Sequence, residues 1–78
     1  MELNFYFDGR FGVDPEFICK VENAQSYPQI QTGEIIEFQD SYGDKLKKII
    51  GKNKSLAIRQ IKHCIHPEKG MTVNIYCC

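Results

Sequence analysis

The segment SLAIRQIKHCI, residues 55–65, separates two possible folds for this 78-residue chain. Read as a strand, it places Leu56 and Ile58 on one face, and a β-bulge between Arg59 and Ile61 absorbs the slip in phase that follows. Read as a helix, it has one apolar stripe, formed by Ala57, Ile61, Cys64 and Ile65. We predict the strand, because five strands close into a small barrel more compactly than four strands and two helices pack together.

Four other segments alternate apolar and polar residues, as half-buried strands do. They cover residues 3–8, 17–22, 34–39 and 71–77. A short helix precedes residues 55–65, with Ser41 as its cap, an apolar stripe that starts at Leu46, and Gly51 as its stop. The predicted fold is therefore mainly β: a single domain over residues 1–78, a five-stranded SH3-like or related barrel with one short helix. The α+β alternative has a second helix at 55–65.

The chain resembles small proteins of phages and mobile elements at several positions of this pattern. They are Pro28, Gly33-Glu34 leading into Ile36, the Ile61-x-His63 pair and the terminal strand. The resemblance spans residues 27–76 and breaks at residues 44–54, where this chain carries a lysine-rich insertion. It implies a small barrel of phage-type origin and assigns no site residue.

The charges of the chain are divided by position. Residues 1–44 carry nine acidic and two basic side chains, a net charge of −7, and residues 45–78 carry one acidic and eight basic side chains, a net charge of +7. Such a division gives a folded chain faces of opposite sign. Together with the small core of a chain this short, it predicts a homo-oligomer.

The basic side chains cluster in one region and supply the predicted ligand-binding set. This set contains Lys45, Lys47, Lys48, Lys52, Lys54 and Arg59. A lysine-rich turn holds a phosphate without hydrolysing it. The sequence therefore predicts a non-enzymatic protein that binds a partner protein or an anionic small molecule such as a nucleotide signal. A phage accessory or counter-defence role is what the resemblance implies.

Three apolar or aromatic residues are predicted to lie opposite the core stripe and to form an interface. They are Tyr6, Ile18 and Tyr76, from the first, second and last strands. A contiguous apolar patch of this kind is typical of a contact surface.

A zinc-stabilised module is the main alternative. Its ligands would come from His63, Cys64, His66, Cys77 and Cys78. The spacing departs from that of common zinc sites, and on a strand His63 and His66 point to opposite faces. We therefore predict free thiols, no metal and no cofactor.

Other classes of function find less support. No catalytic signature occurs, so an enzyme is not expected. Nucleic acid is not an expected partner, because no aromatic residues are interleaved with the basic residues 45–62 and the pI is near 6.7. A minor nucleic-acid-binding protein stays an alternative. No apolar run reaches the length of a membrane span and no signal peptide is visible, so a cytoplasmic protein without membrane contact is predicted.

Overall fold

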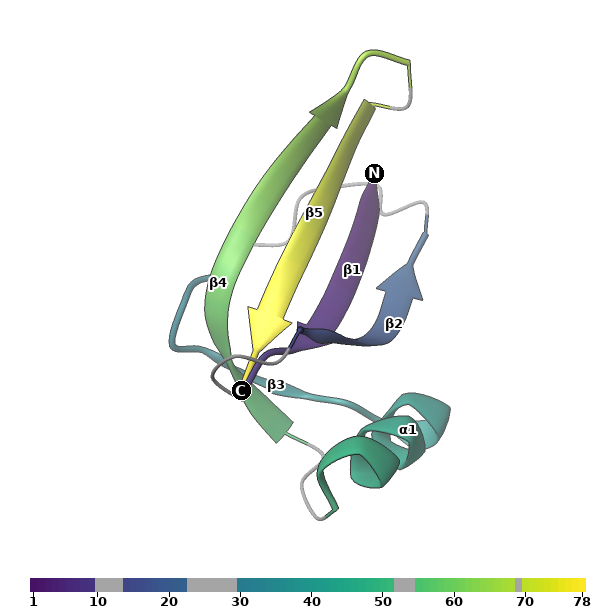
Figure 1. The fold of residues 1–78 in the computed structure, drawn as a ribbon, viewed down its shortest axis with the longest axis vertical. Coiled ribbons are helices and arrows are strands. Elements are labelled where there is room, and N and C mark those ends of the chain that lie inside the picture. The colour runs from purple at the N-terminus through teal and green to yellow at the C-terminus, as the bar shows by residue number, and fades with distance from the viewer. Residues whose placement is uncertain (10–13, 23–29, 52–54, 69) are drawn as a thin grey trace.

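One curled sheet dominates the computed structural model, which describes residues 1–9, 14–22, 30–51, 55–68 and 70–78 (Figure 1). The described residues form β1 (Glu2–Phe7), β2 (Glu16–Val21), β3 (Ile35–Glu37), α1 (Asp40–Ile50), β4 (Ser55–His66) and β5 (Gly70–Cys77). The strand order is β2-β1-β5-β4-β3, with β1 and β5 parallel and the other neighbours antiparallel. The mainly β prediction is confirmed, and the sheet forms a half-barrel.

The ambiguous segment is a strand. β4 runs for 12 residues, and its pairing with β5 shifts register between Ile58 and Gln60. Arg59 is the extra residue, so the predicted phase slip is resolved by a bulge at this position. The bulge keeps Ile58 and Ile61 on the same face of the sheet.

The centre of the sheet is the parallel pair β1 and β5. Its end is closed by a hydrogen bond that the Asp8 amide donates to the Cys77 carbonyl, 2.8 Å away. The chain turns at Gly9, where a Cβ atom would lie 2.7 Å from the ring of Phe7. Only glycine therefore fits this turn without displacing Phe7.

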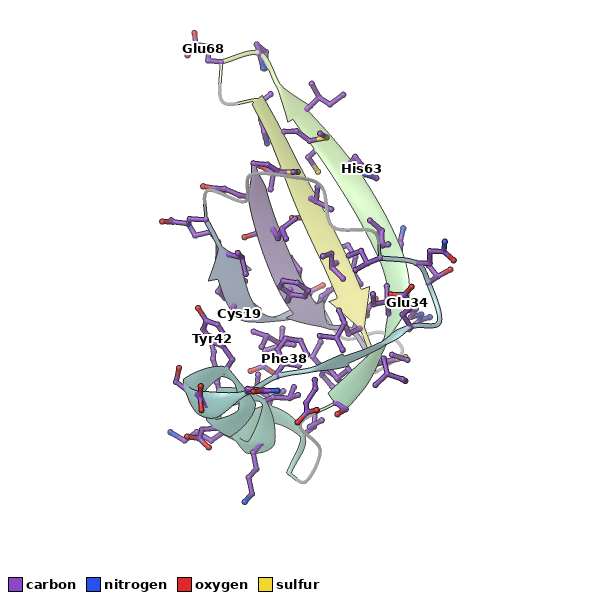
Figure 2. The ribbon with its side chains drawn as sticks, turned by 180° about the vertical axis from the view of Figure 1, so that it is seen from behind. Cys19, Glu34, Phe38, Tyr42, His63 and Glu68 are labelled. Carbon is purple, nitrogen blue, oxygen red and sulfur yellow. The ribbon has the colours of Figure 1, made fainter. Side chains whose placement is uncertain are left out.

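The hydrophobic core lies on one face of the sheet, here called the core face. The buried strand residues are Leu3, Ile18, Cys19, Leu56, Ile58, Val73, Ile75 and Cys77. Phe38 and Leu46 cover them from the segment after β3 and from α1, and Phe38 lies between α1 and the sheet (Figure 2). The rings of Phe5 and Phe38 meet edge to face at 5.8 Å.

The helix and the third strand differ in their bounds from the sequence prediction. Gln39 is the N-cap of α1 without a side-chain hydrogen bond, and Ser41 lies inside the helix, so the predicted cap is wrong. Gly51 ends the helix as predicted: its φ is positive, at 95°, and its amide donates a hydrogen bond of 2.8 Å to the Lys47 carbonyl. β3 contains three residues because the chain then leaves the sheet to bury Phe38.

Candidate functional site

Three aromatic rings form a row across the face of the sheet opposite the core, here called the outer face. Tyr6 and Tyr76 are direct partners in the parallel pair, and their rings stack at 5.2 Å with an angle of 20°. Tyr6 also pairs with Phe17 of β2, and these rings meet at 5.6 Å and 70°. Phe17, Tyr6 and Tyr76, the aromatic row, thus join three neighbouring strands.

A bulge in β2 places Phe17 in this row. Phe5 pairs with Cys19 and Tyr6 pairs with Phe17, so Ile18 is an extra residue. The extra residue reverses the phase of the strand: Ile18 is 1% exposed, whereas Phe17 is 41% exposed. The prediction that Ile18 lies on an exposed patch with Tyr6 and Tyr76 is therefore wrong, and Phe17 takes that place.

Lys45 connects the lysine-rich segment to the aromatic row. Its Nζ atom lies 5.0 Å from the ring centroid of Phe17, within the range of a cation–π contact. The next residue, Leu46, is fully buried and anchors α1 against the core. The anchor holds the Lys45 ammonium at the β2 end of the row.

The positive charge of Lys45 also affects the pKa of a buried thiol, that of Cys19. Burial raises the pKa of Cys19, and the positive charge of Lys45 partly opposes this rise. Burial raises the pKa of Cys77 to about 11, and Cys78 and Cys19 add to the shift. Both buried cysteines are therefore protonated thiols at neutral pH.

The other predicted ligand-binding side chains do not gather at Lys45. Lys47 and Lys48 line a shallow hollow on α1 together with Asp44 and Gly51. Arg59 donates a hydrogen bond of 2.9 Å to the Asp8 carbonyl and so connects β4 to the end of β1. Lys52 and Lys54 lie outside the described residues.

A second row of polar side chains runs beside the aromatic row. The register places Lys20, Asn4, Asn74 and Lys62 across four strands, and we call this set the polar row. The Asn4 amide donates a 3.1 Å hydrogen bond to Oδ1 of Asn74, and the Asn74 amide contacts the Cys64 sulfur at 3.7 Å. Lys20 forms an exposed ion pair with Glu22.

A repeated motif in the sequence marks the central members of both rows. Residues 3–7, LNFYF, and residues 73–77, VNIYC, share an Asn-x-Tyr motif at matching positions. The parallel pair aligns the two motifs, so asparagine meets asparagine and tyrosine meets tyrosine. Each cross-strand pair contributes about 0.2–1 kcal/mol and helps to fix the register.

The residues of the zinc alternative lie in different places. Cys64 and His66 are on the outer face, His63 is on the core face, and Cys77 is buried. Among the described residues, no group of three histidine, cysteine or acidic side chains is placed to hold a metal ion. All four cysteines are thiols in this structure.

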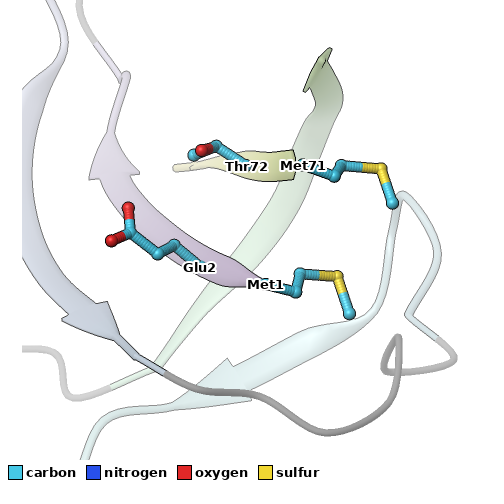
Figure 3. A pocket seen from close by; sticks show the side chains of 4 residues that line it. All are labelled: Met1, Glu2, Met71 and Thr72. Atoms are coloured by element: carbon cyan, nitrogen blue, oxygen red, sulfur yellow. The ribbon is translucent and has the colours of Figure 1, made fainter. Parts of the chain in front are cut away.

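A small hollow lies at the opposite end of the β1–β5 pair from α1. It has a volume of about 260 Å³ and is lined by Met1, Glu2, Met71 and Thr72. The two methionine side chains point to one side and Glu2 and Thr72 to the other (Figure 3). Its one charged side chain is the carboxylate of Glu2.

Comparison with known protein families, characterised proteins and solved structures finds no match for this chain. No helix in the part of the chain that the structure describes is both long and apolar enough to cross a membrane.

Proposed function

We propose that this domain is a non-enzymatic binding module for an anionic ligand that carries a flat ring, of the nucleotide class. The observation that carries the proposal is the position of Lys45, whose ammonium lies 5.0 Å from the Phe17 ring at the end of the aromatic row. Partly exposed rings stack on a flat ligand, and a neighbouring ammonium attracts its phosphate.

The charge of Lys45 is available to a ligand. Among the described residues, no carboxylate lies within 4.0 Å of its ammonium. Lys47 and Lys48 line a hollow with Asp44 and Gly51, and no aromatic residue is among its described lining residues. The lysine that contacts the rings is therefore the best-placed cation of the predicted set.

The test compares Lys45→Gln with Lys48→Gln, a matched change on the exposed side of the same helix. Tyrosine fluorescence or calorimetry follows titration with adenosine monophosphate and, separately, with inorganic phosphate. We expect the nucleotide to bind more tightly than phosphate, and Lys45→Gln to weaken nucleotide binding about three- to tenfold, the range of one partly exposed charge contact. Equal affinities for the two variants would refute the assignment of the site to Lys45.

Three further predictions from the sequence are independent of this proposal. Self-association through the oppositely charged halves of the chain stays a prediction that salt dependence tests. The phage-type origin and an acidic protein partner also stay predictions.

A further inference from the structure

We propose that the outer face binds single-stranded nucleic acid, several nucleotides of which lie across the aromatic and polar rows. This inference rests on the proposed function, and it names the ligand of the same site as a polymer rather than a single nucleotide. Three features carry it: the spacing of the cations, the chemistry between them, and the position of aromatic rings and cations on one face.

The cations stand at opposite sides of the sheet. Lys45 lies at the β2 side, where it contacts Phe17, and Lys62 lies on β4, whereas Lys20 of β2 is ion-paired with Glu22. Three strand spacings of about 4.8 Å separate β2 from β4, a distance of about 14 Å. One phosphate group cannot contact both sides, whereas the backbone of an oligonucleotide presents a phosphate at each.

The groups between the cations suit bases. Tyr6 and Tyr76 stack on each other, so the ring face of Tyr76 turned away from Tyr6 is the surface on which a base can stack, and the neighbouring Asn4 and Asn74 amides offer donors and acceptors for base edges. The two rows themselves contain no carboxylate, but Glu22 pairs with Lys20, and Glu2 lies beside the polar row on the same strand as Asn4. The positive charge left for a phosphate is therefore that of Lys45 and Lys62.

The fold removes one argument against a nucleic acid. The basic segment, residues 45–62, contains no interleaved aromatic residue, and by itself it predicts no nucleic-acid partner. In the structure, Phe17 reaches Lys45 from β2, and Tyr6 and Tyr76 continue the row from β1 and β5. Aromatics and cations that are far apart in the sequence thus share one face.

A single strand fits this face better than a duplex. The bases of a duplex are stacked on each other, so their flat faces cannot contact the aromatic row. The bases of a single strand can stack on protein rings, and this stacking tolerates any sequence. We therefore expect binding with little sequence preference.

The experiment measures the affinity of the full chain for fluorescently labelled oligothymidine and oligouridine of one to twelve nucleotides. We expect affinity to rise with length and to level off at about four to six nucleotides, near the lower limit for single-strand-binding folds. Similar curves for the two series would show that the shared chemistry of DNA and RNA is recognised, and a tighter oligouridine series would assign the ligand to RNA. Both results support the proposal.

Two variants connect the binding to the rows. Lys62→Gln should lower the slope of log affinity against log salt by about 0.7, the value for one phosphate contact of a single strand, and Lys48→Gln should leave it unchanged. Tyr76→Leu should weaken binding at least fivefold while circular dichroism keeps its native shape, because loss of one stacking contact costs about 1–3 kcal/mol.

Three results would overturn the inference. A mononucleotide that binds as tightly as a dodecamer would remove the polymer and leave the proposed function standing. Equal binding of a duplex or of polyphosphate, with no effect of Tyr76→Leu, would show that charge alone is recognised. Binding of neither mononucleotides nor oligonucleotides would overturn this inference and the proposed function together.

Discussion

Replacing Ile18 with alanine tests the bulge that builds the aromatic row. The side chain of Ile18 is 1% exposed, and truncation of a buried isoleucine to alanine costs about 2–5 kcal/mol. Val21 lies on the same strand but is 39% exposed, so Val21→Ala should cost less than about 1 kcal/mol. Simple alternation along residues 17–22 gives the reverse order, with Val21 in the core and Ile18 outside.

Urea unfolding, followed by far-ultraviolet circular dichroism, measures both free energies. A domain of this length has a total stability of about 4–12 kcal/mol, so Ile18→Ala should move the unfolding midpoint far toward zero urea. If Val21→Ala proves more destabilising than Ile18→Ala, β2 contains no bulge, and Phe17 does not belong to the aromatic row.

Three further predictions concern the helix, the thiols and assembly. Leu46→Ala should lower the unfolding free energy by about 2–5 kcal/mol and weaken nucleotide binding through the loss of α1 docking, whereas Lys48→Ala in the same urea series should change stability by less than 0.5 kcal/mol. Burial raises the pKa of Cys77 from its ordinary value of 9.0 to about 11, so the stability that its protonated thiol contributes should be complete below pH 9 and be lost as pH rises toward 11. Urea unfolding at several pH values measures this loss. An equally steep loss of stability at alkaline pH in Cys77→Ala would assign the loss to another group. Light scattering should show an oligomer at low salt that dissociates as salt is raised, and a monomer under all conditions would contradict the charge-split prediction.

Much of the fold follows from local patterns in the sequence. Alternation predicts β1 and β5, and the slip in phase near Arg59 predicts the bulge in β4, because a buried face permits one register only. Gly51 marks the end of α1 through a conformation that glycine adopts readily. These features depend on neighbouring residues, so the sequence displays them directly.

The candidate site could be predicted only in part. Tyr6, Tyr76 and Lys45 are each predicted from the sequence. The contact between Tyr6 and Tyr76 depends on a parallel pairing of segments about 70 residues apart, which no local pattern specifies, and Lys45 joins them only through Phe17. The bulge at Ile18 was hidden, because Ile18 and Cys19 are both apolar and either phase gives an acceptable strand. The shared Asn-x-Tyr motif was visible in the sequence but acquires meaning only once β1 and β5 are paired.

The most direct test of the central claim is a nuclear magnetic resonance titration of the labelled protein with a six-nucleotide oligothymidine, observed at the backbone and side-chain amides. We predict that the signals of Asn4 and Asn74 shift progressively, because both lie in the polar row beside the rings, while the exposed Gln39 at the start of α1 does not shift. Shifts at Gln39 and along the helix surface around Lys48, with Asn4 and Asn74 unmoved, would contradict a binding site on the outer face.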